Sequence, residues 1–504
     1  MVKSKLYTIG IIFVVALLIA IPVAAGIAGQ GVSGVQIQNL STTAATSVTV
    51  QLWNQNGSAP IDISAAGGDS IPPAAARNYY LPNLTDVPEG AYALIASAPN
   101  PIAGIARTDW ATTGGAAIYS SRDTGTDVTI PLVTRNFANQ TSQFTIQNTN
   151  TGAAINDVDI TLYGRGSSTP IITLENQTIP AGTSRTWSLN DAAWGTLPNT
   201  GLDMGASGFV GSLRITSGTE LVVQSMIDLP GTPGVTAFSG VPTASASTNL
   251  FCPLIRANYY GDTGISVVNP NNTDVNVAIT FYADAGSPNK PAPVTQNLAV
   301  PANSSAVAFQ GPGGNSRTAG LPGGSQTTAN PTPTNNGFYG VARISATGGN
   351  VLAVVNDTMF GANWAVRSQS SYNCSTADEA GTQFALPLVR RYHLAATRLT
   401  TGIQVQNTTG SPVTVSMDLY NWDGTRQAAS DPADITIPAN GSGNFWSGNW
   451  TNLPTVPPAA GGSGWYGSAI LTATGNVVVV VSDEGFGNTA VDSANYNGLV
   501  MGAE

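Results

Sequence analysis

The stretch IPLVTRNFANQTSQFTIQN, residues 130–148, recurs with small changes at two later places in the chain. CPLIRANYYGDTGISVVN spans residues 252–269, and LPLVRRYHLAATRLTTGIQVQN spans residues 386–407. A weaker copy, IPVAAGIAGQGVSGVQIQN, spans residues 21–39. Self-similarity at a regular spacing indicates repeated structural units, so the fold is decided by what one copy and its surroundings form.

Each copy leads into two segments of alternating apolar and polar residues, joined by a turn rich in Asn, Thr and Gly. This alternation is typical of strands, and the turn chemistry predicts a hairpin. A strand that starts at an Ile-Pro or Val-Pro step and a second hairpin follow in every unit. The first segments end at Asn39, Asn148, Asn269 and Asn407, and the second segments end at Trp53, Tyr163, Tyr282 and Tyr420.

Counting these strands gives about seven per unit, which predicts an all-β chain of four tandem seven-stranded antiparallel β-sandwiches of immunoglobulin-like type. Polar runs between the units place their boundaries. Placed end to end, at about 3.3 Å per strand residue, the units predict a rod on the order of 150 Å long. The predicted divisions are a signal or anchor segment at 1–28 and sandwiches at 29–123, 124–243, 244–377 and 378–504.

The units resemble the tandem extracellular β-sandwich (immunoglobulin-like) repeats of bacterial cell-surface proteins. The resemblance rests on the stretches PLIRANYYGDTGISVVN, IPANGS and GWYGSA, with their counterparts in the other units, and it covers nearly the whole chain after the N-terminal segment. It implies a surface or extracellular location and a structural or adhesive role. It names no ligand and no catalytic residue.

The N-terminal segment has the features of an export signal. Lys3 and Lys5 precede an apolar run over residues 9–23, and small residues follow, which predicts cleavage after Ala25 or Ala28. The uncharged stretch is also long enough for a retained membrane anchor. A pilin-type leader is a third interpretation, although the glutamate usual in pilins is missing. All three predict a secreted or cell-surface protein that contacts a membrane only through this segment.

Composition excludes several functions. Only 9% of the residues are charged, and Lys290 is the single lysine after the N-terminal segment, so there is no basic patch to hold nucleic-acid phosphates. His393 is the only histidine and stands where other copies carry Tyr259, Tyr260 or Phe137, which indicates a packed ring. Motifs of nucleophilic, phosphate-binding or zinc-dependent enzymes are missing, as are acidic calcium loops. We therefore expect no catalytic residue, no cofactor and no metal site.

Two cysteines fit an oxidising compartment. Cys252 opens the third unit and Cys374 lies near its end, so we expect either a disulfide that closes this unit or two buried thiols.

Aromatic residues are frequent in the fourth unit, where Trp446 and Trp450 occupy a loop-rich stretch. Exposed rings there would contact carbohydrate, whereas buried rings would complete the sandwich core. Asn-x-Ser/Thr triplets supply candidate glycosylation sites, although asparagine also suits turns. These sites are Asn83, Asn139, Asn176, Asn303 and Asn440.

The first unit suggests a route to assembly. Its counterpart of the PLV strand crosses the cleavage zone, so cleavage would leave an unpaired sheet edge. Leu499, Val500 and Met501 follow the last strand and are placed to donate a strand to the next subunit, giving a homopolymer. Alternatively, the uncleaved segment supplies the strand, or the first unit has six strands.

Two functions follow from these observations. The first is a non-enzymatic extracellular structural protein, a subunit of a surface layer, sheath or filament assembled by β-strand addition. The alternative is a cell-surface adhesin or carbohydrate-binding stalk whose aromatic-rich fourth repeat is the binding module.

Overall fold

The protein is described here by a computed structural model of the 504-residue chain. The described residues are 13–19, 31–55, 57, 59–110, 114–120, 124–202, 207–230, 234–311, 318–321, 337–360, 366–395, 397–456, 462–485 and 493–501.

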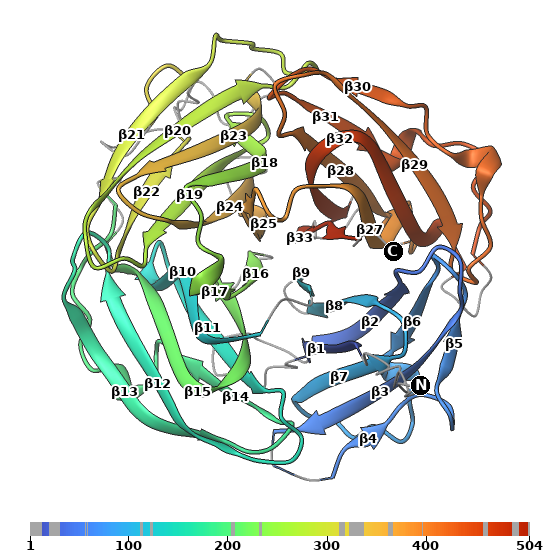
Figure 1. Ribbon diagram of the computed structural model, residues 1–504, viewed down its shortest axis with the longest axis horizontal. Helices are drawn as coiled ribbons and strands as arrows, with labels where there is room; N and C mark the ends of the chain where they lie inside the picture. The colour runs from blue at the N-terminus through green and yellow to red at the C-terminus, as the bar shows by residue number, and fades with distance from the viewer. Residues whose placement is uncertain are drawn as a thin grey trace, which may run out of the picture.

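The described chain is all-β, and its strands pair antiparallel, as the sequence predicts. The strands form four consecutive groups, which lie side by side around a common centre (Figure 1). We call them the first to fourth groups. Whether each group is an independent domain with the boundaries expected from the sequence stays a prediction.

The first group contains two sheets, in the orders β1-β7-β3-β4 (with β5 on β3) and β6-β2-β8-β9. Its elements are β1 (Phe13–Ile19), β2 (Gly31–Asn39), β3 (Thr46–Asn54), β4 (Ile61–Asp62), β5 (Asp69–Ile71), β6 (Ala76–Tyr80), the 3-10 turn η1 (Leu81–Asn83), β7 (Tyr92–Ala98), β8 (Ile102–Trp110) and β9 (Gly115–Ser120).

In the second group one long strand, β15, runs through both layers. It pairs with β12 and β10 in its first half and with β11 and β16 in its second half. The elements are β10 (Gly125–Phe137), β11 (Gln140–Asn148), β12 (Ile155–Gly164), β13 (Pro170–Ile179), β14 (Ser184–Ser188), η2 (Ala192–Trp194), β15 (Phe209–Asp228), β16 (Val235–Ser239), β17 (Val241–Pro242) and η3 (Thr243–Ser245).

The third group repeats the two-sheet arrangement, in the orders β21-β20-β23-β18-β26 and β22-β19-β24-β25. Its elements are β18 (Asn249–Ala257), β19 (Gly261–Asn269), β20 (Val275–Ala283), β21 (Val294–Val300), β22 (Ser304–Phe309), β23 (Phe338–Thr347), β24 (Leu352–Phe360), β25 (Val366–Asn373) and β26 (Ser375–Thr376).

The fourth group resembles the second, because β32 runs through both of its layers. Its elements are β27 (Gly381–Arg391), β28 (Leu399–Asn407), β29 (Val413–Asn421), η5 (Ala428–Ser430), β30 (Ile435–Ile437), β31 (Ser442–Trp446), η6 (Ser447–Asn449), β32 (Trp465–Gly485), β33 (Ser493–Asn497) and β34 (Leu499–Val500).

The groups contain more strands than the seven expected. A strand follows each Ile-Pro or Val-Pro step, as expected (β6, β14, β22 and β31), but a further strand ends at that step (β5, β13, β21 and β30). A short closing strand also ends the later groups (β17, β26 and β34). Sequence reasoning missed both of these kinds, because the strands before the step are short or largely exposed and the closing strands have only two residues.

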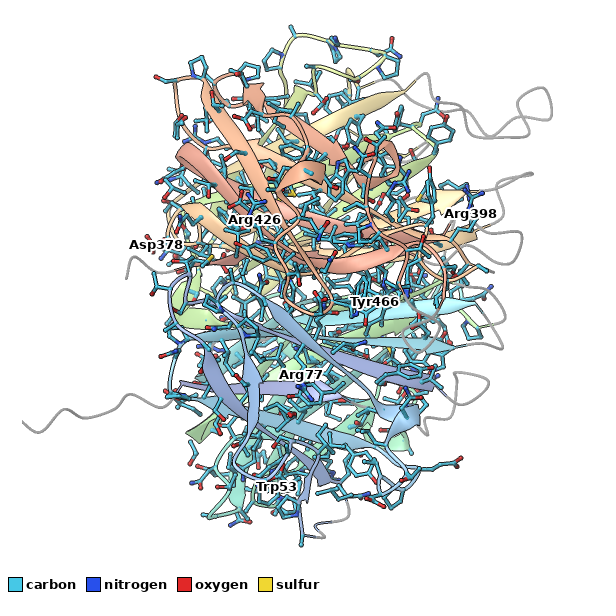
Figure 2. The ribbon with its side chains drawn as sticks, turned by 90° about the vertical axis from the view of Figure 1, so that its right-hand side faces the viewer. Trp53, Arg77, Asp378, Arg398, Arg426 and Tyr466 are labelled. Carbon is cyan, nitrogen blue, oxygen red and sulfur yellow. A yellow bond between two sulfur atoms is a disulfide. The ribbon has the colours of Figure 1, made fainter. Side chains whose placement is uncertain are left out.

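The four groups close a ring, which corrects the predicted rod. Their last inner strands meet at the centre, where β9 contacts β16, β16 contacts β25, β25 contacts β33, and β33 contacts β9 (Figure 1). Seen from the side, the fourth group lies directly against the first (Figure 2).

Shared cores explain why a ring forms. Val354 of the third group packs into the core of the second, Val480 of the fourth into the core of the third, and Ile105 of the first into the core of the fourth. The first core receives Met226 from the second group. An end-to-end rod would expose these apolar side chains to water, so burying them favours closure.

A glutamine contact recurs between neighbouring groups. The Nε2 of Gln147 donates to the carbonyl oxygen of Leu94 at 3.3 Å, which joins the second group to the first. Gln406 joins the fourth group to the third by the equivalent bond, and Gln38 joins the first group to the fourth. The first and fourth groups, which close the ring, are therefore joined by the same glutamine-to-carbonyl bond as groups that follow one another in the chain. At the second–third interface Val268 occupies the glutamine position.

The asparagine that ends the first hairpin strand is buried in all four groups. The Nδ2 of Asn407 donates to the carbonyl oxygens of Ser411, Ile437 and Pro438. The other three asparagines make the corresponding three bonds. Each one ties its own turn to the Ile-Pro or Val-Pro step, which explains why these motifs recur together in the sequence.

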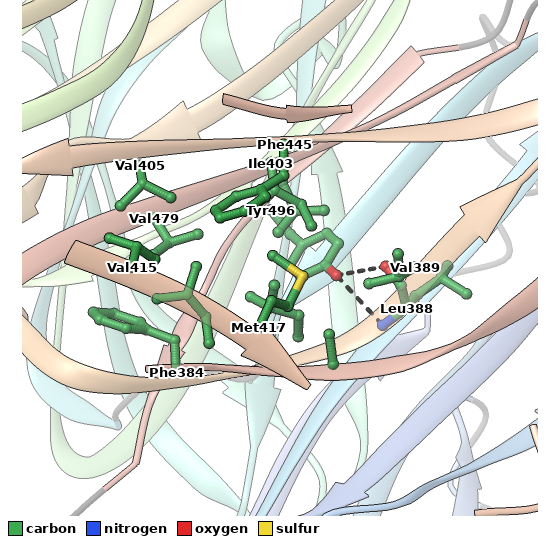
Figure 3. Close-up of a cluster of buried hydrophobic side chains, with 14 of the residues drawn as sticks. Phe384, Leu388, Val389, Ile403, Val405, Val415, Met417, Phe445, Val479 and Tyr496 are labelled. Carbon is green, nitrogen blue, oxygen red and sulfur yellow. Dashed lines mark hydrogen bonds between the residues drawn. The ribbon is translucent and has the colours of Figure 1, made fainter. Parts of the chain in front are cut away.

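A buried tyrosine anchors the PLV strand of the fourth group (Figure 3). The register of β27 shifts between Leu386 and Val389, so the peptide groups of Leu388 leave the ladder. The hydroxyl of Tyr496 donates to the Leu388 carbonyl oxygen at 2.6 Å and accepts from its N–H at 3.3 Å. Tyr372 does the same in the third group. Burial raises the pKa of the Tyr496 hydroxyl well above its usual value.

The expected disulfide is confirmed. Cys252 in β18 is bonded to Cys374, which follows β25, and their Cα atoms are 4.6 Å apart. The bond lies in the core of the third group.

The C-terminal strand is used within its own group. Leu499 and Val500 form β34, which pairs with β27, and the N–H of Met501 donates to the Gln383 carbonyl oxygen at 3.0 Å. The closing strands β17 and β26 pair with β10 and β18 in the same way. This placement corrects the expectation that these residues start a strand in the next subunit, because their backbone groups already have partners.

The apolar N-terminal segment supplies a strand. β1 pairs with β7 from Phe13 opposite Ala98 to Ile19 opposite Tyr92. The expected counterpart began slightly later, at Ile21, so the alternative in which this segment itself provides the strand matches the structure. The predicted cleavage positions lie outside the described residues. No helix within the described ranges is long and apolar enough to cross a membrane.

Candidate functional site

A cavity of about 590 Å³ opens between the third and fourth groups. Its lining combines aromatic rings with polar and charged side chains contributed by both groups. The third group contributes Leu254, Arg256, Tyr259, Tyr260, Asp284, Gly286, Tyr339, Met359 and Arg367, and the fourth contributes Gly402, Gln404, Asn444, Trp446, Ser482 and Glu484. We call this cavity the cleft.

Rings from the third group form one wall of the cleft. The ring of Tyr259 lies 5.2 Å from the rings of both Tyr260 and Tyr339, centroid to centroid. Tyr260 is 43% exposed and, like Asn258, adopts a positive φ of 54°. Non-glycine residues rarely adopt this conformation, so the turn holds a large ring in solvent at a cost in backbone strain.

The fourth group contributes the facing wall. Trp446 is the last residue of β31 and is half-buried, and Asn444 precedes it by two residues on the same strand. Because strand side chains alternate, both point to the same face of the sheet. Gly402 and Gln404 stand opposite them on β28. A Cβ atom at Gly402 would lie 3.5 Å from the Trp446 ring, so the glycine lets this ring lie close to β28.

A hydrogen-bond network joins the two walls. The hydroxyl of Tyr339 donates to Oε1 of Gln404, and the Nδ2 of Asn444 donates to the same Oε1 at 3.1 Å. Buried Asp284 accepts from the Nε2 of Gln404 at 3.2 Å and from the Ser442 hydroxyl at 2.5 Å. Burial, reinforced by Asp284, raises the pKa of Tyr339, so this phenol stays neutral and keeps its proton to donate.

The charges beneath the cleft neutralise one another. The Nη1 of Arg256 lies 2.6 Å from Asp357, and its Nη2 lies 3.2 Å from Glu484 across the interface. Burial lowers the pKa of Arg256, but the two carboxylates raise it by more, so the guanidinium remains charged. Burial raises the pKa of Asp357 to about 6, against the opposing effect of Arg256. The buried Nε of Arg256 has no hydrogen-bond partner among the described residues.

This arrangement suits a neutral polyhydroxylated ligand. Flat aromatic faces pack against the apolar faces of sugar rings, while amides and a neutral phenol exchange hydrogen bonds with hydroxyl groups. Among the described residues, no three His, Cys, Asp or Glu side chains gather as metal ligands.

The two tryptophans predicted as carbohydrate contacts occupy different environments. Trp446 lines the cleft, whereas Trp450 is 6% exposed and packs in the core of the fourth group. The expectation for Trp450 is therefore corrected. The turn η6 lies between the two residues and sends the second ring into the sandwich.

Sequence reasoning missed most of the cleft, including Tyr339, Asp284 and Gln404. A signal existed in the stretches GFYG and GWYG, where a second aromatic residue follows the one that enters the core. In an alternating strand this second ring must point to the opposite face. What it meets there depends on a neighbouring group, which no local pattern specifies.

The candidate glycosylation sites lie in turns and on strand surfaces. Asn83, Asn139 and Asn176 are exposed, and Asn303 and Asn440 are half-buried. All except Asn83 adopt a positive φ, which asparagine tolerates better than most residues. This backbone conformation accounts for asparagine at these four positions, and glycosylation stays a prediction.

Comparisons with known proteins are sparse. A model of a family of unknown function, DUF5719, matches residues 23–253, less than half of the chain. No curated protein matches the sequence.

Among solved structures, the Thermotoga maritima protein 1070 is 12% identical over 24% of this chain and 97% of its own, with a TM-score of 0.20. The partial N-terminal region of an enterococcal surface protein and the B domain of a biofilm associated protein are each 8% identical over 79% of this chain. They are covered to 90% and 80%, with TM-scores of 0.17 and 0.18. Similarities this weak carry no argument about function.

Proposed function

We propose that this protein is a non-enzymatic carbohydrate-binding protein of the cell exterior and that the cleft is its binding site. The observation that carries the proposal is the pairing of exposed and half-buried rings, Tyr260 and Trp446, with the amide and phenol network of Gln404, Asn444 and Tyr339. An extracellular location is supported by the disulfide and by the apolar N-terminal segment.

The cleft lining contains two arginines, Arg256 and Arg367, and two acids, Asp284 and Glu484, so its formal charges balance, which favours a neutral over an anionic glycan. Arg256 is already paired with Asp357 and Glu484, so its charge is compensated within the protein. An anionic ligand would lose its hydration on binding there and would gain little from an arginine that is already paired.

The other expected function, a subunit of a layer, sheath or filament, stays a prediction. The pairing of β34 with β27 removes only strand addition by the C-terminal residues as its route of assembly. Self-association itself stays a prediction.

An array of neutral and acidic oligosaccharides, followed by isothermal titration calorimetry with the best neutral binder, tests the proposal. We expect Trp446→Ala to weaken binding at least about tenfold, the equivalent of 1.4 kcal/mol. Trp53→Ala is the matched control, because Trp53 is a half-buried indole at the first–second interface. Binding to none of the neutral glycans, or equal binding by the Trp446 variant and wild type, would refute the proposal.

A further inference from the structure

The residues that form the cleft recur at one other interface, between the fourth and first groups. In both interfaces a glycine faces an aromatic residue across two strands, and a glutamine faces an asparagine two positions further on. The pairs are Gly402–Trp446 and Gln404–Asn444 in β28–β31, and Gly34–Tyr80 and Gln36–Asn78 in β2–β6.

The wall opposite these pairs also recurs. Tyr339, the second aromatic of GFYG, accepts a hydrogen bond from Asn444 at 3.2 Å. Tyr466, the second aromatic of GWYG, is hydrogen-bonded to Asn78 of the first group, and this bond lowers its pKa against the larger raising effect of burial. Tyr466 lies where the ribbon of the fourth group meets that of the first (Figure 2).

The turn above that wall has the same geometry in both places. His393 stands at the Tyr259 position, and its ring lies 4.8 Å from the Tyr466 ring. The next residue, Leu394, stands at the Tyr260 position and shares its rare backbone conformation, with a φ of 64°. Leu394 is 37% exposed, so an apolar tip again projects into solvent.

Ionic groups beneath the two sites correspond as well. Arg390 lies 2.9 Å from Asp483, as Arg256 lies 2.6 Å from Asp357. At the fourth–first interface the ion pair across the groups joins Asp483 to Arg107 at 2.6 Å. Both interfaces therefore contain a buried, compensated charge network below an aromatic and amide surface.

The remaining interfaces lack this set of residues, so it is not a by-product of the repeated fold. At the second–third interface the corresponding cross-strand pairs are Gly264–Phe309 and Ser266–Val307. The projecting tip there is Ala138, with a φ of 49°. At the first–second interface Thr186 and Ser188 replace the asparagine and the aromatic residue.

We infer that the fourth–first interface is a second carbohydrate site, which makes the ring bivalent. The inference rests on the proposed function of the cleft and extends it. Tyr80, 44% exposed, provides the ring that Trp446 provides in the cleft, while Gln36 and Asn78 provide the amides. Trp422 stands where the cleft has Asp284, and its ring lies 6.3 Å from that of Tyr466. The second site therefore offers more apolar surface and one carboxylate fewer.

Two sites on neighbouring interfaces of one ring favour polymeric ligands. Once one site holds a chain of repeating sugars, the second binds another segment at high effective concentration. We expect a polysaccharide to bind more tightly than the oligosaccharide that fills one site.

Calorimetry with the oligosaccharide that binds the cleft tests this inference through stoichiometry. Wild type should bind two molecules per chain, Tyr80→Ala and Trp446→Ala should each bind one, and the double variant should bind none. Phe309→Ala, at the equivalent position of the second–third interface, is the matched control and should bind two. Unchanged thermal unfolding of the Tyr80 variant shows that the ring remains folded.

The outcomes separate the two proposals. One molecule per chain, lost with Trp446→Ala and unaffected by Tyr80→Ala, overturns the second site and leaves the cleft standing. Binding that neither variant alters overturns both.

Discussion

The third–fourth and second–third interfaces have the same backbone arrangement but carry different side chains. At the third–fourth interface large rings and amides face one another and leave a cavity. At the second–third interface small hydroxyl side chains reach the neighbouring main chain directly. The Ser266 hydroxyl donates to the Pro131 carbonyl oxygen at 2.8 Å, and the Ser304 hydroxyl donates to that of Gly164 at 3.2 Å.

The side chains at an interface therefore decide whether it only holds the ring together or also offers a binding site. Ring closure brings equivalent strand faces together four times, so each interface is a potential site by geometry alone. Side chains then decide whether the interface is sealed, as with Ser266 and Val307, or opened, as with Gln404 and Asn444. A repeated fold can thus carry binding at some interfaces and stability at others.

One acidic position illustrates the same contrast. Asp109, Asp228 and Glu484 occupy equivalent places, opposite the start of the last inner strand of their groups. Asp109 and Glu484 are paired with arginines at the two interfaces that carry aromatic and amide residues. Asp228 lies at the first–second interface, where burial alone raises its pKa.

The largest effect is expected where the ring closes. Asp483 is fully buried between Arg107 and Arg390, so Asp483→Asn leaves two guanidinium groups short of a counter-charge. We expect a loss of roughly 3–4 kcal/mol in the free energy of unfolding, measured by urea denaturation. Asp418→Asn, which breaks an exposed pair with Arg426, should cost less than about 1 kcal/mol. Equal losses in the two variants would contradict a special role for the closing interface.

A smaller effect is expected from pH at Asp228. Burial raises the pKa of Asp228 to about 6 from its ordinary 3.8, so the folded protein holds this proton more tightly than the unfolded chain. Its contribution to stability is present below about pH 4 and is lost as the pH rises to about 6. The loss should be at most on the order of 3 kcal/mol.

Asp228→Asn should remove this part of the pH dependence and stabilise the protein at pH 7. Urea denaturation between pH 4 and pH 7 measures both effects. A variant whose stability follows that of wild type at every pH would show that Asp228 ionises normally in the folded state.

The smallest effect concerns the glutamine contact. Gln406→Val copies Val268, which already occupies this position at the second–third interface. Losing the bond to the Ala342 carbonyl oxygen should cost about 1 kcal/mol in unfolding free energy. Gln177→Val is the control, because the Gln177 amide donates to the Glu175 carbonyl oxygen within its own strand. If Gln177→Val lowers the unfolding free energy by as much as Gln406→Val, the bond across the interface contributes no stability of its own.

Much of the fold was predictable from particular residues. The alternation before Asn148 and Asn407 predicted β11 and β28, and the turns after them predicted hairpin partners β12 and β29. The spacing of Cys252 and Cys374 within one unit left a disulfide open, and the structure contains it. The strands β21 and β30, which end at the Val-Pro and Ile-Pro steps, were missed because β21 is exposed along one side and β30 has only three residues.

The sequence by itself determined the main strands, the hairpins and the buried faces, because these depend on alternation and turn chemistry between neighbouring residues. Only the tertiary structure decided that the groups form a ring, that Tyr339 meets Gln404, and that β34 returns to β27. The physical reason is that these contacts join outward-facing side chains and strand edges far apart in the chain. Local patterns specify which residues face outward, and the packing of whole groups specifies what those residues meet.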